Sequence, residues 1–171
     1  MLPEKTFVII GPESTGKTTL CKELAKHFNS HWIPEYAREY LEKIKRKYNY
    51  LDVLHIAHKQ IKIENEVSLP NDTYLFIDTD LIITKIWFKH VYNEYPLWID
   101  DYLSKAYRKA YLIAYPDIPW QYDPLRENPH IREYLFDLYV KEVEKFKFSY
   151  HIIKGLNEQR TMNAINYCMI Y

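Results

Sequence analysis

The stretch GPESTGKT at 11–18 constrains the fold of this chain more than any other feature. It directly follows an apolar run at 7–10 and fits the pattern GxxxxGK[ST], which needs a strand before it and a helix after it. In such a loop the backbone N–H groups converge on phosphate oxygens, and the following helix adds the partial positive charge of its N-terminus. The chain has only three glycines, and two of them, Gly11 and Gly16, occupy the fixed positions of the motif. The sequence therefore predicts a loop that binds a nucleoside triphosphate, with an ordinary strand-turn-helix corner as the alternative.

Two side chains of this loop are expected to make specific contacts. Lys17 would reach the β- and γ-phosphates, and Thr18 would place its hydroxyl on Mg²⁺. The residues expected to hold ATP through the loop are Gly11, Pro12, Glu13, Ser14, Thr15, Gly16, Lys17, Thr18 and Thr19.

Length, charge and cysteine content limit the class of protein. At 171 residues the chain can form one domain with a sizeable core, and we expect a single domain over 1–171. A formal net charge of zero gives no global field toward nucleic acid or an anionic membrane, and no stretch has the length of a membrane span or the pattern of a signal peptide. Cys21 and Cys168 lie far apart on predicted helices, which indicates reduced thiols and a cytoplasmic location. The oligomeric state stays open, and a homo-oligomer is possible.

Short apolar runs alternate with helical patterns along the chain. Strands are predicted at 5–10, 31–33, 73–77, 110–114 and 149–153. Helices are predicted at 17–28, 35–47, 52–67, 80–92, 96–107, 130–146 and 157–169, the fourth of them capped by Thr79 or Asp80. Strands separated by helices favour an α/β fold, here an open, mainly parallel five-stranded sheet with helices on both faces.

The segment at 116–129, PDIPWQYDPLRENP, does not fit a plain scaffold. It holds four prolines in fourteen residues, so it cannot be regular helix or central strand. Loops of this length inside compact domains are usually functional, and we expect an active-site lid, with a rigid surface connection as the alternative. Arg126 and Arg132 flank its end, where a guanidinium could neutralise charge that develops on transferred phosphate.

Acidic residues follow two of the predicted strands, where ligands bind in open parallel sheets. Asp78 stands where a phosphate-loop protein needs a carboxylate for Mg²⁺, usually through water, although it could instead cap a helix. Glu35 could accept the proton of a substrate hydroxyl as a general base, could mainly position that hydroxyl, or could simply lie in the first turn of its helix. Arg38, one turn later, could pair with Glu35 rather than contact a ligand.

Together these motifs resemble the ribosylnicotinamide kinase domain of the NadR family, within the P-loop small-molecule kinases. The matching stretches are GPESTGKTTL (11–20), PEYAREYLE (34–42), Asp52 with IAHKQ (56–60), FIDTDLIITKIW (76–87) and DIPWQYDPLREN (117–128). The resemblance implies a P-loop kinase fold and transfer of the ATP γ-phosphate to the 5′-hydroxyl of nicotinamide riboside, which gives nicotinamide mononucleotide. Some relatives also carry adenylyltransferase and DNA-binding domains, for which we expect no room in this chain.

The resemblance and the motifs together give expected site residues. The catalytic residues expected are Lys17, Glu35, Asp78 and Arg126. Thr18 and Asp78 would serve Mg²⁺, partly through water, and Arg126, Arg132 and Arg160 would join the loop in binding ATP. The acceptor-binding set expected is Glu35, Tyr36, Arg38, Asp78, Asp80, Trp87 and Trp120.

One part of the acceptor site stays open at this stage. Family members hold the nicotinamide ring between aromatic side chains, but Pro34 stands here where some relatives carry an aromatic. Tyr36, Trp87 and Trp120 are therefore the candidates for stacking. The alternatives for the whole chain are a kinase of another nucleoside or small alcohol, and a non-catalytic regulator that binds ATP; ATP and GTP are not distinguished.

Overall fold

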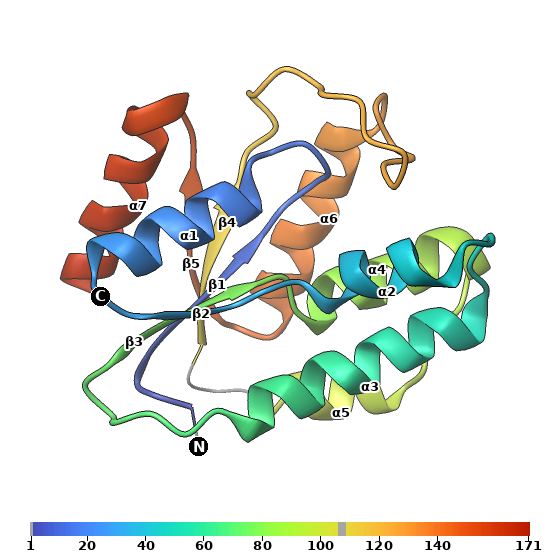
Figure 1. Cartoon of the computed structure of the whole chain (residues 1–171), viewed down its shortest axis with the longest axis horizontal. Coiled ribbons are helices and arrows are strands. Elements are labelled where there is room, and N and C mark those ends of the chain that lie inside the picture. Colours follow the sequence, from blue (N-terminus) through green and yellow to red (C-terminus); the bar gives the residue numbers. More distant parts are fainter. Residues whose placement is uncertain (1, 106–108) are drawn as a thin grey trace.

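The structure is a computed structural model that describes residues 2–105 and 109–171. The strands are β1 (Lys5–Ile10), β2 (His31–Ile33), β3 (Tyr74–Asp78), β4 (Lys109–Ala114) and β5 (Ser149–Ile153). The helices are α1 (Lys17–His27), α2 (Tyr36–Ile44), α3 (Tyr50–Glu66), α4 (Leu81–Tyr92), α5 (Trp98–Leu103), α6 (Arg132–Lys145) and α7 (Asn157–Ile170). The strands form one five-stranded sheet in the order β2-β3-β1-β4-β5, with every pairing parallel (Figure 1). The predicted α/β fold with a five-stranded sheet is confirmed.

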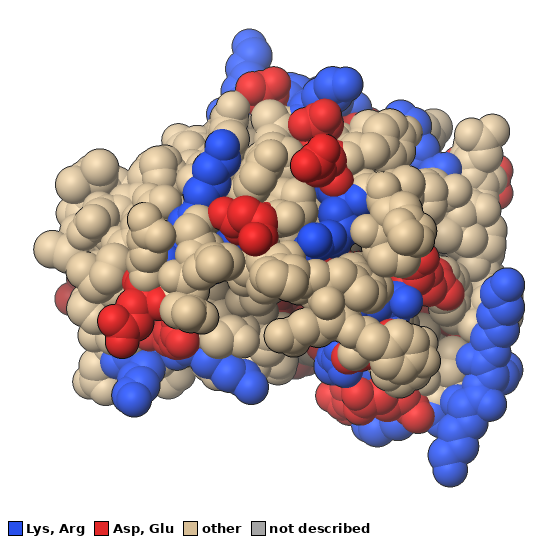
Figure 2. Space-filling model, turned by 90° about the horizontal axis from the view of Figure 1, so that it is seen from above, with Lys and Arg blue, Asp and Glu red and all other residues tan. Residues whose placement is uncertain are grey.

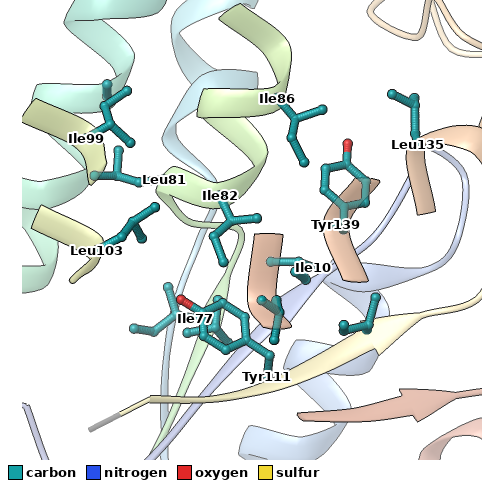
Figure 3. Close-up of a cluster of buried hydrophobic side chains, with 14 of the residues drawn as sticks. Ile10, Ile77, Leu81, Ile82, Ile86, Ile99, Leu103, Tyr111, Leu135 and Tyr139 are labelled. Carbon is teal, nitrogen blue, oxygen red and sulfur yellow. The ribbon is translucent and has the colours of Figure 1, made fainter. Parts of the chain in front are cut away.

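Strand β1 lies at the centre of the sheet, and its side chains alternate between two cores. Phe7 and Ile9 face a core formed with α1 and α7. Val8 and Ile10 face a larger core formed with α3, α4, α5 and α6, part of which is drawn in Figure 3. Because helices cover both faces, both sets of alternating positions must be apolar, which is why the strand reads as a continuous apolar run.

Most predicted elements are present, and their ends differ for local reasons. The helix predicted at 35–47 ends at Ile44, because Lys45 adopts a left-handed conformation with φ 47°. The helix predicted at 52–67 begins two residues earlier, at Tyr50. There the Asn49 side chain accepts from the backbone N–H of Asp52, whose carboxylate accepts in turn from the Asn49 N–H. The helix predicted at 96–107 is α5, and the predicted end at 107 lies outside the described residues.

The 116–129 segment contains neither helix nor strand, as its prolines predict. It connects β4 to α6 and lies at the same end of the sheet as the loop between β1 and α1, at the top in Figure 1. This end carries the carboxyl ends of the strands, where ligands bind in sheets of this kind. Across the parts of the chain that the structure describes, no helix combines the length and apolar character that crossing a membrane requires.

Candidate functional site

The loop after β1 turns tightly because of its two glycines. Gly11 has φ 147°, and a Cβ placed on it would lie 2.6 Å from the carbonyl oxygen of Ala114. Gly16 has φ 74° and is the N-cap of α1, where the described residues supply no capping side chain. The N–H groups of the first turn of α1 are therefore left available for an anion. The geometry is that of a phosphate-binding loop.

The carbonyl oxygen of Pro12 organises the inside of this loop. It accepts hydrogen bonds from Thr15 Oγ1 at 2.8 Å and from Lys17 Nζ at 2.9 Å. The ammonium of Lys17 thus folds back over its own loop, where the phosphates of a nucleotide would be competing acceptors.

Thr18 and Asp78 meet beneath the loop. The Thr18 hydroxyl donates to Asp78 Oδ2 at 2.6 Å, and Asp78 is the last residue of β3 and fully buried. Its Oδ1 is buried and has no hydrogen-bond partner among the described residues. Burial raises the pKa of Asp78, and the hydrogen bond from Thr18 and the charge of Lys17 oppose that rise.

This pair of side chains fits a Mg²⁺ ion, because both offer oxygen ligands and one buried oxygen lacks a partner. Within residues 2–105 and 109–171, no three histidine, cysteine or acidic side chains gather around one point. The protein would thus supply only part of a coordination shell, which suits Mg²⁺ because it usually keeps waters and substrate phosphates. The alternative in which Asp78 caps a helix is wrong, since Asp80 is the N-cap of α4.

Glu35 is the N-cap residue of α2, but its side chain makes no capping hydrogen bond. Its carboxylate lines the same cavity as Lys17 and Thr18. Burial raises the pKa of Glu35; the positive charge of Lys17 opposes this rise, and the negative charge of Asp78 adds to it. A partly buried carboxylate with a raised pKa, next to a phosphate loop, is suited to accept a proton.

The 116–129 segment is folded onto the phosphate loop. The carboxylate of Glu13 accepts from the backbone N–H of Glu127 at 3.1 Å and from that of Asn128 at 2.8 Å. The backbone N–H of Gln121 donates to Ser14 Oγ at 2.9 Å. These contacts are those of a closed lid rather than of a detached surface connection.

The two arginines at the end of this segment have different neighbours. Arg126 donates to the carbonyl of Gln121 at 2.6 Å, lies 3.5 Å from Ser14 Oγ, and lines the cavity. Arg132 donates to the carbonyls of Ser14 at 3.2 Å and Ile118 at 2.9 Å. Arg132 therefore ties the segment to the loop, whereas Arg126 faces the place where phosphates would lie.

Arg38 also contacts the lid. Its guanidinium pairs with Asp123 at 2.6 Å and with Glu42 at 3.3 Å. The sequence left open whether Arg38 pairs with Glu35; its partners are instead these two carboxylates. Arg38 still lines the cavity, on the side of α2.

Tyr48 is a cavity residue that the sequence reasoning missed. Its hydroxyl donates to Glu127 Oε2 at 2.7 Å and accepts from Trp87 Nε1 at 3.1 Å. Burial raises the pKa of Tyr48 well above its usual range, so the phenol stays protonated. No motif surrounds Tyr48, one of seventeen tyrosines, so only the fold reveals its place.

The three aromatic candidates for stacking lie in different places. Trp87 lines the cavity together with Tyr48. Tyr36 is hydrogen-bonded to His55 at 3.3 Å, on an exposed face, and is not part of the lining. Trp120 lies under Arg132, whose guanidinium carbon is 5.9 Å from the ring centre, and is likewise outside the lining. The structure therefore brings only Trp87 of the three to the cavity.

Asp80 is placed differently from the prediction. It is fully buried; Oδ1 accepts from the Ile82 N–H at 2.9 Å, and Oδ2 accepts from the Tyr111 hydroxyl at 2.7 Å. Lys109 lies 3.5 Å from the same Oδ2 and pairs with Glu64 at 2.7 Å. The prediction that Asp80 contacts a ribose is corrected, because both of its oxygens are already used inside the protein and it does not line the cavity.

The buried Lys109 pair gives a stability prediction. Lys109→Met should lower the free energy of unfolding by about 3–5 kcal/mol, because it leaves the buried carboxylates of Glu64 and Asp80 without a cation. Urea denaturation measures this change. Lys62→Met, at an exposed lysine that pairs with Glu66 at 3.7 Å, is the matched control and should cost less than about 1 kcal/mol. A similar small loss for both variants would contradict the prediction.

Arg160 joins two loops at the far end of the cavity. It is buried and donates to the carbonyls of Gly155 and Tyr115, each at 2.9 Å, and it pairs with Asp117. It also lines the cavity with the start of α7. Its expected contact with ATP stays a prediction.

All these groups surround one cavity of about 600 Å³. Its lining comes from the phosphate loop, α1, Glu35, α2, α4, the lid, α6 and the start of α7. From above, positive and negative side chains are interspersed, and neither sign dominates the face (Figure 2). A ligand would therefore be recognised by individual groups and not by a broad field.

Comparisons with known proteins agree with this geometry. A family model described as an AAA domain matches residues 6–160. The Escherichia coli (strain K12) protein named trifunctional NAD biosynthesis/regulator protein NadR is 28% identical over 133 residues, which cover 71% of this chain. The chain spans only 31% of the length of that relative. The resemblance to NadR that the motifs indicate is thus confirmed as a similarity.

Solved structures share the fold. A crystal structure of NadR protein in complex with NR has a TM-score of 0.72 and 24% identity, covering 98% of this chain and 51% of that one. A second structure of NadR protein, with NAD and AMP-PNP, has a TM-score of 0.71 and 24% identity, covering 98% and 49%. Thymidylate kinase from Ehrlichia chaffeensis has a TM-score of 0.61 and 15% identity, covering 96% and 94%. Because the family model covers most of the chain, the protein belongs to the AAA_28 family of AAA domains, with the fold of the P-loop kinases.

Proposed function

We propose that this protein is a Mg²⁺-dependent kinase that transfers the γ-phosphate of ATP to the 5′-hydroxyl of nicotinamide riboside, giving nicotinamide mononucleotide. The observation that carries the proposal is the single cavity that holds Lys17 and Thr18 of the phosphate loop, Glu35 opposite them, and Arg126 of the lid. The similarity to NadR, one structure of which contains NR and another AMP-PNP, supports this choice of acceptor and donor.

On the ATP side, the amides at the start of α1 and the ammonium of Lys17 would bind the phosphates. Thr18 and Asp78 would hold Mg²⁺, which neutralises charge on the β- and γ-phosphates when bound. Arg126 would face the γ-phosphate from the lid, and the start of α7 with Arg160 would border the adenine. Most of the catalysis would then come from positioning and electrostatic stabilisation, as is general for phosphoryl transfer.

On the acceptor side, Glu35 would accept a hydrogen bond from the 5′-hydroxyl and take its proton as the phosphoryl group transfers. Trp87 would form one wall for the nicotinamide ring. Its indole N–H donates to Tyr48, so the orientation of the ring is fixed before a ligand enters. Because Tyr48 also donates to Glu127 of the lid, closure of the lid and formation of this wall would occur together.

The test is a substrate panel with the purified chain, ATP and Mg²⁺, in which phosphorylated products are separated by chromatography. Nicotinamide riboside should be turned over faster than ordinary nucleosides and deoxynucleosides. Equal or better turnover of deoxynucleosides would reject the acceptor and leave a kinase of another nucleoside. Release of ADP that does not depend on any added alcohol would reject the kinase and favour a nucleotide-responsive regulator.

We further propose a reducing, cytoplasmic location. Cys21 and Cys168 are both unpaired and buried. Burial raises the pKa of each thiol, so both stay protonated and unreactive. Two inert thiols support a protein that is not held together by disulfides.

A further inference from the structure

A second, much smaller cavity lies on the other side of Glu35. Its volume is about 10 Å³, and its lining includes Glu35, Gln60 of α3 and Thr79 of the turn before α4. Glu35 lines both this cavity and the large one, so it stands between them. The small cavity plays no part in the proposed function.

Two polar side chains of the small cavity are buried without partners. Gln60 is 3% exposed and Thr79 is 5% exposed. Gln60 Nε2 and Thr79 Oγ1 make no hydrogen bond to any of the described residues. A buried donor or acceptor left unsatisfied costs about 1–3 kcal/mol, so two of them around one cavity indicate a missing partner.

The orientation of the Gln60 amide is fixed by its neighbours. The backbone N–H of Tyr36 donates to the side-chain oxygen of Gln60 at 3.3 Å, so the atom that faces Tyr36 must be the oxygen. The amide nitrogen also lies near Glu64, where it opposes the burial that raises the pKa of that carboxyl. This uses at most one of its two N–H donors and leaves the other for the cavity. Gln60 thus holds the first residue of α2, directly after Glu35, and also faces the space behind Glu35.

Thr79 is held in place by its backbone. Its φ is 74°, a conformation that is uncommon for a residue branched at Cβ. Its N–H donates to the carbonyl of Ile9 at 3.0 Å, which fixes the turn to the centre of the sheet. Strain of this kind persists where the surrounding structure requires it, often near functional groups. The hydroxyl is therefore presented to the small cavity by a rigid turn.

We propose that Gln60 and Thr79 hold one buried water against Glu35, and that both are positioning residues for this carboxylate. A space of about 10–15 Å³ with two to four polar partners is what one buried water needs. Here the amide N–H, the hydroxyl and the carboxylate supply three partners. The water donates to one side of Glu35 and so keeps the other oxygen directed into the large cavity.

The structural test does not depend on the substrate. A high-resolution crystal structure of the free protein should show density for one water within hydrogen-bond distance of Gln60 Nε2, Thr79 Oγ1 and Glu35. The same site should be dry in Thr79→Val, which keeps the branched shape and removes the hydroxyl. A dry cavity in the wild type would overturn the proposal, and so would a complex in which an atom of the acceptor fills the space.

The kinetic test rests on the proposed function and uses whichever acceptor the substrate panel selects. Thr79→Val should lower kcat by about 10-fold, the low end of what is lost when a group that orients a reacting residue is removed, with the Kd for ATP unchanged. Thr79→Ser, which keeps the hydroxyl, should restore kcat to within about twofold of the wild type. Loss of activity in both variants would show a purely structural role and overturn the assignment.

A double variant tests whether both residues act through the same water. Gln60→Leu alone should also lower kcat by about 10-fold, and Gln60→Leu with Thr79→Val should lose no more than either single variant. Losses that multiply would contradict a shared water. Because the crystallographic result stands without any turnover, an incorrect acceptor assignment and an absent water can be told apart.

Discussion

Lys17→Ala is expected to lower kcat by about 10³-fold and to weaken ATP binding. Lys17 lines the cavity, and its ammonium rests 2.9 Å from the Pro12 carbonyl of its own loop. Bound phosphates would attract that charge more strongly than a neutral carbonyl does, and the attraction would grow as charge develops in the transition state. Steady-state kinetics with ATP and the acceptor, together with calorimetric titration of an ATP analogue, measure both effects.

The matched control for this variant is Lys26→Ala, at an exposed lysine in the last turn of the same helix. It should leave kcat and the Kd for ATP within about twofold of the wild type, since surface substitutions away from the site change little. Thermal unfolding should show that both variants are folded, because the described hydrogen bond of the Lys17 ammonium is local to the loop. Unchanged activity in Lys17→Ala would remove the assignment of a phosphate-binding loop.

Glu35→Gln is expected to lower kcat by about 10²–10⁴-fold while the Kd for ATP stays near that of the wild type. The amide keeps the shape of the side chain but cannot accept the proton of the acceptor hydroxyl. Glu35 makes no capping hydrogen bond in α2, so the substitution removes no capping contact. Glu39→Gln is the matched control, because Glu39 lies on the same helix and is exposed, where it pairs with Lys43 at 2.5 Å. A large loss of ATP affinity in Glu35→Gln would instead make Glu35 a structural residue.

The same residue sets the expected pH dependence. A general base acts only when it is deprotonated, and burial raises the pKa of Glu35 above its ordinary value of 4.5. The value of kcat/KM should therefore fall on the acid side at a pH above 4.5, as Glu35 becomes protonated. The pH profile of the residual activity of Glu35→Gln should lack this fall. A profile that stays unchanged in the variant would assign the titration to another group.

Local patterns in the sequence predicted much of the fold. The strand at 5–10, the loop with Gly11 and Gly16, and the helix from Lys17 are fixed by neighbouring residues, and the structure has them where the pattern places them. The prolines at 116–129 predicted an irregular segment for the same reason. Helix ends were less accurate, because the Asn49–Asp52 capping box and the left-handed Lys45 depend on side chains that the apolar pattern does not weigh.

The site was predicted only where a strand end or a motif marks the residue. Asp78 and Glu35 follow strands and lie at the carboxyl edge of the sheet, as expected. Asp80 stands two residues from Asp78, and sequence alone could not show that its oxygens bond to Tyr111 and to the start of α4. Tyr48 lies outside the motifs that were weighed, yet its hydroxyl joins Trp87 to the lid.

The sequence by itself determined that this chain is an α/β protein with a phosphate-binding loop, because φ preferences and apolar periodicity act between residues that are close along the chain. Only the tertiary structure decided which side chains share a cavity. The contact between Thr18 and Asp78, the closure of the lid on Glu13 and Ser14, and the small cavity behind Glu35 all join segments far apart in sequence. Such contacts follow from the order of the strands and the packing of the helices, which no local pattern contains.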